Sequence, residues 1–448
     1  MTAAEKLTSM FYEETRYLHP LEELLPLQIA AMNELLTERR AQIRVLDGRA
    51  RDAGVDAIGD LSNAVPLLFA HTVYKSYPEA FLADGRWDRM CMWLETLSSS
   101  EPRGLDMSGV TDVDQWVERL HEAGHFVYSS SGTTGKCSFL DQNEFERDLL
   151  ADEVVRSIHW ASGVEANSDR PVFILGPRRG AARMVQLFDG FANAFGRPGE
   201  MYWLSDEPMS IGEMTRLGEL ARRLSDGSAT PHEVAEGERR AGQRQERMRQ
   251  ELQVLVDAIV RHRADGSVIF GAGAQLWTIM QMIQERGLGD LEFSPDTLLV
   301  TGGGMKGAEL PQDYLERIRQ FFGVEPRRVV RFYSMSEITA GVFPLCSAGR
   351  YHCPPWVVLF ILDRSGERLL NPATGTVNGR LGAFDLMTQT RWGGIITGDN
   401  VDADFSACPC GAPGPTIQNI VRYADLDDGD DKLTCAGSLD AYVRGLIS

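Results

Sequence analysis

The sequence has little positive charge, very little lysine, and no long uninterrupted apolar stretch. Its 448 residues contain 45 Lys and Arg against 64 Asp and Glu, which gives a formal net charge of −19. Proteins that bind nucleic acid without sequence preference neutralise phosphates with Lys and Arg. This charge therefore excludes a general nucleic-acid binder and disfavours an anionic membrane surface. The most apolar stretch, residues 268–283, is interrupted by Gln275 and Gln281 and is too short to span a bilayer.

The first residues and the cysteines indicate a cytoplasmic protein. Residues 1–17 contain acids, Lys6 and Arg16 but no apolar run, so no signal peptide is predicted. The 7 cysteines are an odd number, which is typical of reduced thiols rather than of a disulfide scaffold. With 43% hydrophobic and 24% charged residues, the chain can bury a large core. Length alone predicts roughly three domain-sized units, or one large α/β domain with appendages.

Short apolar runs that alternate with helical patterns predict a largely parallel, buried sheet. Four such runs each end in Gly, Ser or a turn: residues 172–175, 268–270, 298–300 and 329–332. Apolar residues spaced mostly three and four apart predict helices at the start of the chain. After Pro354 the pattern changes to strand-like runs joined by Gly- and Asp-rich turns.

A loop rich in serine, threonine and glycine, YSSSGTTGK at residues 128–136, directly follows a predicted strand. Small residues let the backbone approach an anion, while successive N–H groups, hydroxyls and Lys136 can surround phosphate oxygens. The loop is not a Walker A motif, because only Thr133 and Thr134 separate its two glycines. A flexible polar turn is the alternative.

A second glycine loop, VTGGGMKG at residues 300–307, also begins at a strand and reaches a lysine, Lys306. Two of the few lysines therefore lie in glycine loops, in a chain that otherwise uses arginine, which indicates that they are chemically required. The lysines are at positions 6, 75, 136, 306 and 432. A glycine turn with an incidental lysine is the alternative.

Two further segments follow predicted strands and group side chains suited to a nucleotide. YSMSE at 333–337 combines an aromatic ring, hydroxyls and a carboxylate, which could stack on a base, contact a phosphate and hold Mg²⁺. In TGD at 397–399, the Asp399 carboxylate could accept hydrogen bonds from ribose hydroxyls. Taken singly, each segment could also be a turn in the core.

Together and in this order, the four segments resemble those of the adenylate-forming superfamily. The most similar family is that of the acyl-protein synthetases of bacterial luminescence, followed by the phenylacetate–CoA ligases. The diagnostic segments are TGGGMKG (301–307), YHCPPW (351–356), ITGDN (396–400) and CPCG (408–411). The resemblance spans most of the chain. It implies an α/β fold with stacked mixed and parallel sheets flanked by helices, plus a small β-rich subdomain.

The resemblance also implies a domain organisation. We expect one large domain over residues 1–425, followed by a short C-terminal remnant at 426–448. The large domain would contain a mostly helical part (1–120), an α/β nucleotide-binding core (121–340) and a β-rich subdomain (341–425). Members of the superfamily usually carry a mobile lid of about 100 residues with a catalytic lysine. Here the lid is expected to be truncated or missing, which leaves the first step to Lys136, Lys306, Lys432 or a partner.

The activity implied is that of an ATP-dependent, AMP-forming carboxylate ligase. A small carboxylic acid attacks the α-phosphate of Mg·ATP to give acyl-AMP and pyrophosphate, and a thiol of a protein, a carrier or CoA then takes the acyl group. Catalysis would come mainly from positioning and charge neutralisation. The alternatives are an acyl- or aryl-CoA ligase, an amide-forming ligase, and a non-catalytic nucleotide- or acyl-binding subunit of a complex. The sequence does not fix the acid, the acceptor or the oligomeric state.

Carried over residue by residue, the resemblance assigns contacts to each part of the nucleotide. The residues expected around the β- and γ-phosphates are Ser130, Ser131, Gly132, Thr133, Thr134, Gly135 and Lys136. Those expected at the adenine are Gly302, Gly303, Gly304 and Tyr333. Ser336 would touch the α-phosphate, Glu337 would bind Mg²⁺, and Asp399 and Arg422 would lie near the ribose. Ser334 and Ser336 replace the usual Gly and Thr; the second change keeps the hydroxyl, whereas the first adds a side chain beside the nucleotide.

The acyl pocket is expected between the sheet and the helices that follow Phe270. Its candidate residues mix small and bulky groups: Gly271, Ala272, Gly273, Leu276, Trp277 and Met280. Their spacing is equally typical of a helix packed in the core.

Histidines and cysteines suggest three secondary sites: a zinc site, a nucleophilic cysteine and a zinc-protease pattern. Two clusters, with the pattern CxxxxxHC and CPC, suit a structural tetrahedral Zn²⁺: Cys346, His352, Cys353, Cys408 and Cys410. Phenylacetate–CoA ligases resemble this chain in placing a Cys/His set in the same region, and buried free cysteines are the alternative.

Cys435 is a candidate nucleophile, because acyl-protein synthetases are thought to pass the acyl group through a thiol near this end; a structural cysteine is the alternative. HEAGH at 121–125 matches a zinc-protease pattern, but Gly124 argues against the continuous helix that this pattern needs.

Overall fold

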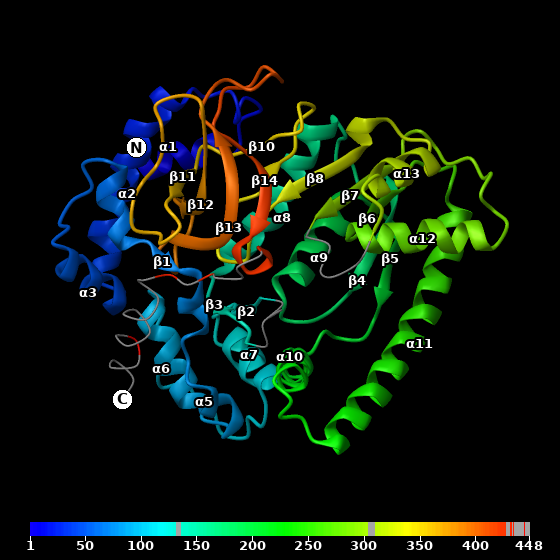
Figure 1. Ribbon diagram of the computed structural model, residues 1–448, viewed down its shortest axis with the longest axis horizontal. Helices are drawn as coiled ribbons and strands as arrows, with labels where there is room; N and C mark the ends of the chain where they lie inside the picture. Colours follow the sequence, from blue (N-terminus) through cyan, green and yellow to red (C-terminus); the bar gives the residue numbers. More distant parts are fainter. Residues whose placement is uncertain (131–135, 303–309, 427–430, 432, 434–442, 444–448) are drawn as a thin grey trace. The chain divides into compact units, whose positions relative to one another are not determined.

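The computed structural model describes residues 1–130, 136–302 and 310–426, together with Asp431, Leu433 and Val443 (Figure 1). The chain divides into two compact units. The first comprises residues 1–130, 138–150 and 335–448, and the second comprises residues 131–137 and 151–334. The N-terminal residues and the residues after 341, which are expected as separate parts of the large domain, therefore lie in one unit.

The first unit begins with helices, as the apolar spacing predicts. They are α1 (Ala3–Met10), α2 (Leu21–Arg40), α3 (Arg44–Ala53), α4 (Leu61–Ala64), α5 (Glu79–Ala83), α6 (Trp87–Leu97) and α7 (Val113–Glu122). A capping box opens α1, in which the side chain of Thr2 accepts from the Glu5 amide and Glu5 accepts from the Thr2 amide. Gly54 closes α3 with a φ of 64°, a conformation in which a side chain would be strained. These local signals set where α1 begins and where α3 ends.

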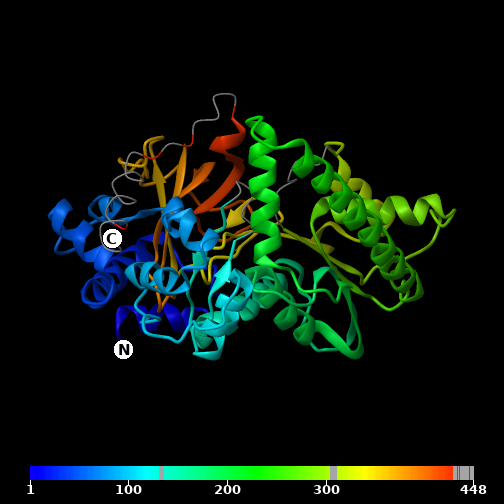
Figure 2. The ribbon, with the colours of Figure 1, turned by 90° about the horizontal axis from the view of Figure 1, so that it is seen from below.

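A mixed six-stranded sheet forms the other part of the first unit. Its order is β10 (Tyr351–His352), β14 (Thr416–Arg422), β13 (Gly394–Asp404), β12 (Thr376–Asp385) and β11 (Val357–Leu362), and β1 (Phe69–Ala70) pairs parallel with β13. The other neighbours are antiparallel, and these strands confirm the runs predicted after Pro354. The N-terminal helices lie beside this sheet in both ribbon views (Figures 1 and 2), and the ring of Phe11 contacts that of Trp356 at 5.1 Å between centroids.

A short hairpin and a short strand complete the first unit. Strands β2 (Tyr128–Ser129) and β3 (Phe139–Leu140) pair antiparallel, and β9 spans Phe343–Pro344. Helix α8 (Glu144–Ser162) carries the chain from the first unit into the second.

The second unit contains the parallel sheet that the four apolar runs predict. Its strands lie in the order β5 (Gly196–Ser205), β4 (Arg170–Pro177), β6 (Val268–Phe270), β7 (Leu298–Gly302) and β8 (Val329–Tyr333), each parallel to the next. Its helices are α9 (Arg183–Phe195), α10 (Ile211–Ser225), α11 (Pro231–Arg261), α12 (Gly273–Glu285) and α13 (Tyr314–Phe321). The carboxyl ends of all five strands meet at one edge, which is where open parallel sheets bind ligands.

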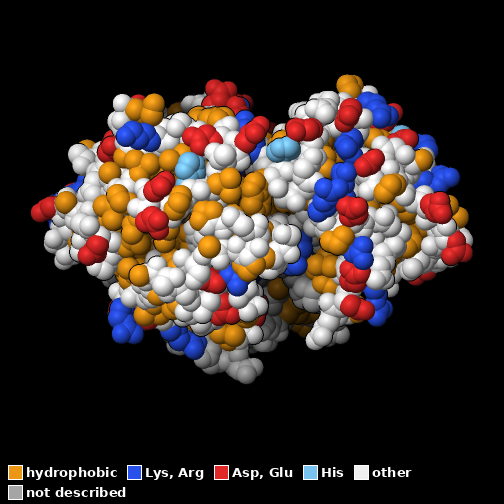
Figure 3. All heavy atoms as spheres, turned by 90° about the horizontal axis from the view of Figure 1, so that it is seen from above, with side chains coloured by type: hydrophobic (Ala, Val, Ile, Leu, Met, Phe, Trp, Pro, Cys, Tyr) orange, Lys and Arg blue, Asp and Glu red, His pale blue; other side chains and the backbone are white. Residues whose placement is uncertain are grey.

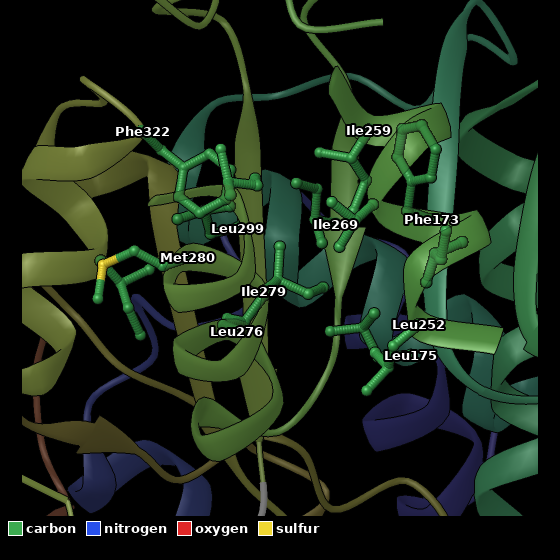
Figure 4. Close-up of a cluster of buried hydrophobic side chains, with 14 of the residues drawn as sticks. Phe173, Leu175, Leu252, Ile259, Ile269, Leu276, Ile279, Met280, Leu299 and Phe322 are labelled. Atoms are coloured by element: carbon green, nitrogen blue, oxygen red, sulfur yellow. The ribbon is translucent and has the colours of Figure 1, made fainter. Parts of the chain in front are cut away.

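Helices α11 and α12 cover one face of the parallel sheet (Figure 4). Ile269 and Leu299 from the strands pack against Ile259 of α11 and Leu276 and Ile279 of α12. The first half of α11 is solvated, as its charge pattern predicts, and its Glu236 pairs with the arginines three and four residues further on. Acidic and basic side chains are interspersed on the face drawn in Figure 3. Among the described residues, no helix has the length and the apolar composition needed to cross a bilayer.

Candidate functional site

The base of the predicted phosphate loop is closed by hydrogen bonds between the residues that directly follow β2 and precede β3 in the first unit. The Ser130 amide donates to the Ser138 carbonyl at 3.1 Å, and the Ser138 amide donates to the Ser130 hydroxyl at 3.0 Å. Lys136 is half-buried. The loop itself lies outside the described residues, so the phosphate contacts of its members stay predictions: Ser131, Gly132, Thr133, Thr134 and Gly135.

The segment that carries Ser336 and Glu337 is a turn held by buried side chains of the first unit. The Tyr128 hydroxyl donates to the Ser336 carbonyl at 2.7 Å, and the Arg391 guanidinium donates to the Glu337 carbonyl at 3.1 Å. Both side chains of the turn are half-buried, whereas Ser334 is exposed. The added side chain at position 334 is therefore accommodated by solvent rather than by packing.

The predicted ribose residues lie opposite each other on adjacent strands. Asp399 of β13 and Arg422 of β14 are partners in the antiparallel register. The Asp399 amide donates to the Thr397 hydroxyl at 3.0 Å, which fixes the backbone at the end of the TGD segment. The sheet thus brings together two residues that the sequence separates by 23 positions.

A buried arginine that no sequence pattern marked supports the same strand. Arg380 of β12 is fully buried and donates to the Thr397 carbonyl at 2.8 Å and to the Asp431 carboxylate at 2.7 Å. The ring of Tyr423 lies 4.0 Å from its guanidinium carbon. His71 Nε2 lies 3.5 Å from the same aspartate, and burial lowers the pKa of His71 although Asp431 and Glu337 act in the opposite direction.

In the second unit, predicted adenine and acyl residues share the carboxyl edge of the parallel sheet. Gly302 ends β7 and Tyr333 ends β8, and the register pairs Gly302 with Phe332. A Cβ on Gly302 would meet the Phe332 ring at 3.1 Å, so glycine permits this close approach. Gly303, Gly304 and Lys306 lie outside the described residues.

The predicted acyl-pocket residues pack against apolar neighbours. A Cβ on Gly271 would lie 2.3 Å from the Leu175 side chain, and one on Gly273 would lie 2.7 Å from the Tyr314 ring. Leu276 and Met280 belong to the buried core of Figure 4, which supports the core interpretation for these two residues. Trp277 is only partly buried against that core, and Ala272 precedes α12, so both keep their predicted role as candidates.

A pair of arginines that no motif marked lies at the same edge of this sheet. Arg178 and Arg179 follow β4 and, with Asp206, line a cavity of about 480 Å³. The Arg178 guanidinium lies over the Trp203 ring at 4.6 Å, and Arg179 donates to the Asp206 carbonyl at 2.9 Å.

Four of the five predicted zinc ligands lie together in the first unit. The ligand atoms of Cys346, His352, Cys408 and Cys410 are all within 4.8 Å of one another. The Cys346 and Cys408 sulfurs are 3.7 Å apart, and the Cys410 sulfur is 3.4 Å from His352 Nε2. Burial lowers the pKa of His352 to about 4, with Arg350 adding to the effect, so the imidazole is neutral near pH 7. A neutral imidazole and cysteine sulfurs are the ligand types that Zn²⁺ prefers.

The fifth cysteine lies apart from this group. The Cys353 thiol donates to the Val357 carbonyl at 3.3 Å, and burial raises its pKa. Successive residues of an extended chain point to opposite faces, so His352 and Cys353 cannot both face the same cluster. Cys435 lies outside the described residues.

The HEAGH segment does not form the helical pair of histidines that a zinc protease needs. Helix α7 ends at Glu122, and Gly124 has a φ of 87°. His121 Nε2 lies 2.7 Å from the Val127 carbonyl, and burial lowers the pKa of His121. The helix ends within this segment, as the expectation from Gly124 requires.

No protein-family model and no curated protein matches the chain. Solved structures of 2-hydroxyisobutyryl-CoA ligase are similar to it. Its open conformation, in complex with 2-HIB-AMP and CoA, has a TM-score of 0.57 at 12% sequence identity and covers 93% of this chain and 79% of that chain. Its thioesterification state, with the same ligands, has a TM-score of 0.57 at 13% identity and covers 92% and 70%.

A third structure of that enzyme, the postadenylation state with 2-HIB-AMP, has a TM-score of 0.53 at 12% identity and covers 90% and 68% of the two chains. These likenesses confirm the expected mixed α/β fold with sheets flanked by helices, which the chain shares with 2-hydroxyisobutyryl-CoA ligase. The finer resemblance to acyl-protein synthetases and phenylacetate–CoA ligases stays a prediction.

Proposed function

We propose that this protein activates a carboxylic acid with ATP as an acyl-adenylate and then transfers the acyl group to a thiol. The observation that supports this most is the support given in the first unit to four of the predicted nucleotide residues: Ser336, Glu337, Asp399 and Arg422. There, buried side chains hold the main chain of the Ser336–Glu337 turn, and adjacent strands pair Asp399 with Arg422. The fold is shared with an enzyme solved with an acyl-AMP and CoA.

In the first step, a carboxylate oxygen of the acid bonds to the α-phosphorus of ATP and pyrophosphate leaves. Lys136 and the serine-rich loop would neutralise the departing phosphates, and Lys306 or Lys432 are further candidates for this role. The Ser336 hydroxyl would contact the α-phosphate. Glu337 is half-buried, and its main-chain carbonyl is held by a hydrogen bond. Carboxylate oxygens are ligands that Mg²⁺ prefers, so this residue fits a magnesium ligand.

In the second step, a thiolate attacks the acyl carbonyl carbon and AMP leaves with its phosphate. The acceptor we propose is a thiol of a protein or carrier, with Cys435 as a candidate relay. CoA is a second candidate, because the structurally similar ligase was solved with CoA. We place the reaction in the cytoplasm, as the cysteine content predicts.

We also propose that the Cys346, His352, Cys408 and Cys410 side chains hold a structural Zn²⁺. Three sulfurs and one neutral imidazole match a closed tetrahedral site. The ion would tie the turn after β9 to the turn between β13 and β14, which stabilises the sheet without contact with the reaction. Metal binding would release the thiol protons, since burial raises the pKa of Cys408 to about 12 in the metal-free protein.

The test is the exchange of labelled pyrophosphate into ATP, screened over small carboxylic acids. An adenylate-forming enzyme catalyses this exchange only when its acid is present. Lys136→Ala should slow the exchange; an unchanged rate would show that the phosphate-loop assignment is wrong. If no acid supports exchange, alone or with partner proteins, the chain is instead a nucleotide- or acyl-binding subunit.

A further inference from the structure

The turn at residues 336–340 is surrounded by charged side chains buried in the first unit. Arg391 is 2% exposed, and three carboxylates around it, Asp141, Glu146 and Asp385, are exposed by 1% or less. Burying charges is costly unless their bonds are satisfied. These residues come from segments far apart in the sequence, so tertiary contacts rather than local structure bring them together.

Arg391 uses all three of its nitrogens on neutral oxygens. Its Nε donates to the Asp141 carbonyl at 2.9 Å, and its Nη1 donates to the Glu337 carbonyl at 3.1 Å. Its Nη2 donates to the Thr339 hydroxyl at 2.9 Å and to the Tyr128 hydroxyl at 3.3 Å. Burial alone would lower the pKa of Arg391, but nearby tyrosines and carboxylates outweigh it and raise that pKa, so the guanidinium stays charged.

The other peptide groups of the turn are bound in the same way. The Asp385 carboxylate accepts from the Thr339 amide at 2.6 Å and from the Ala340 amide at 3.3 Å. The Trp356 indole donates to the Ala340 carbonyl at 2.6 Å. Residues 336–340 belong to no strand, so no sheet hydrogen bonds hold them. Its shape is therefore set by side chains from other elements.

The carboxylates are themselves held. Glu146 accepts from the hydroxyls of Thr388 and Thr390 at 2.6 and 2.7 Å and from the Gln389 amide at 3.0 Å, all in the segment that leads to Arg391. Asp141 accepts from the Ser98 hydroxyl at 2.8 Å. Glu146 therefore fixes the chain on the approach to Arg391, and Arg391 fixes the turn.

We propose that Arg391 and Tyr128 are positioning residues that fix the main chain of the 336–340 turn and so aim the Ser336 hydroxyl and the Glu337 carboxylate. This inference rests on the proposed function, which gives those two side chains the α-phosphate and Mg²⁺. Tyr128 belongs to β2, so its hydroxyl also joins this strand to the turn.

The test compares Tyr128→Phe and Arg391→Lys with a control, Thr96→Val. Thr96 is a fully buried residue of the same unit whose hydroxyl donates to the Trp93 carbonyl at 2.7 Å, outside the network. Tyr128→Phe removes one hydroxyl and keeps the aromatic ring, so the variant should fold. We expect the kcat of pyrophosphate exchange to fall by about threefold to tenfold in this variant. The Mg²⁺ concentration that gives half-maximal exchange should rise, and KM for the acid should stay unchanged. Arg391→Lys should have a larger effect in the same direction, and Thr96→Val should match the wild type.

A second readout is independent of activity. Amide hydrogen exchange of the peptide that contains residues 336–340 should be faster in both network variants than in Thr96→Val and the wild type. Unchanged protection of this peptide in both variants overturns the inference, whatever the activity. Faster amide exchange with unaltered kcat and Mg²⁺ dependence also overturns it, because the turn would then not aim catalytic groups. A wild type that supports no pyrophosphate exchange refutes the proposed function instead, and the hydrogen-exchange result still decides whether the network fixes the turn.

Discussion

The 336–340 turn of the first unit, which we propose binds the nucleotide, and the predicted acyl-pocket residues of the second unit are built in contrasting ways. Around residues 336–340, peptide groups are bound by buried polar side chains, among them Arg391 and Asp385. Around Gly271 and Gly273, the backbone packs against the hydrocarbon of Leu175 and the ring of Tyr314. Hydrogen bonds have direction and fix atoms in place, whereas apolar packing fixes volume. The first arrangement suits the alignment of a phosphorus centre, and the second suits selection of a substrate by its size.

The largest effect should come from the polar region. Glu337→Gln removes the carboxylate proposed to bind Mg²⁺ while it keeps the side-chain shape, and we expect pyrophosphate exchange to fall by roughly 10²–10³-fold for every acid. Glu118→Gln, on an exposed position of α7 in the same unit, is the matched control and should keep the wild-type rate. Equal rates for Glu337→Gln and the control would show that the turn does not carry the metal.

The second test asks whether the Cys/His group stabilises the first unit. Purified wild type and Cys353→Ser should each hold one zinc per chain by elemental analysis, and Cys408→Ser should hold none and melt at a lower temperature. The reason is that the Cys408 sulfur lies in the four-ligand group and the Cys353 sulfur does not. A wild-type protein that binds no zinc after dialysis against the ion would contradict the assignment, as would loss of zinc from Cys353→Ser.

The third test concerns the apolar region. Gly271→Ala should lower the free energy of unfolding by about 1–3 kcal/mol, because the new methyl group would overlap Leu175. Adding Leu175→Ala should relieve the overlap, which a double-mutant cycle by urea denaturation would measure.

The control for this substitution is Gly242→Ala in helix α11, where an added Cβ meets no atom within 4 Å. It should raise stability by roughly 0.5–1 kcal/mol, as expected for alanine in a helix. If Gly271→Ala behaves like this control, Gly271 borders open space, and the contrast between the two regions is weaker than described.

The smallest effect is a pH dependence in the first unit. Burial lowers the pKa of His121 below its ordinary value of 6.5. The unfolded chain then binds a proton more readily than the folded chain, so this contribution to stability is complete above pH 6.5 and is lost as the pH falls below it. His121→Gln should lose less stability than the wild type between pH 7.5 and pH 5.5 by urea denaturation. His232→Gln, at an exposed position, should follow the wild type, and identical losses in all three proteins would contradict this account.

The sequence predicts the strands of the parallel sheet well because strands depend on local patterns. The nucleotide contacts of the YSMSE and TGD segments stay predictions. Short apolar runs are sufficient to predict β4, β6, β7 and β8, and the YSMSE and TGD segments are recognisable as strings of residues. The sequence alone could not separate the four proposed zinc ligands from Cys353, because the exclusion of Cys353 depends on the direction of its side chain beside β10. Spacing in the sequence does not reveal that direction.

The supporting network could not be predicted. Arg391 and Tyr128 are 263 residues apart in the sequence, and Glu146 lies at the start of a helix rich in charged residues. A charged residue in a polar segment is usually exposed, so nothing local marks these side chains as buried. Their role follows only from the tertiary contacts that surround the 336–340 turn.

The central claim, that an acyl-adenylate is formed, can be tested by following oxygen from the acid into AMP. Once the exchange assay has identified an acid, it is supplied with ¹⁸O in its carboxylate, together with ATP and a thiol acceptor, and the nucleotide product is analysed by mass spectrometry. The carboxylate oxygen that attacks the α-phosphorus stays with the phosphate when the thiol takes the acyl group. The account predicts AMP that carries one ¹⁸O. Unlabelled AMP, or cleavage of ATP to ADP, would contradict it.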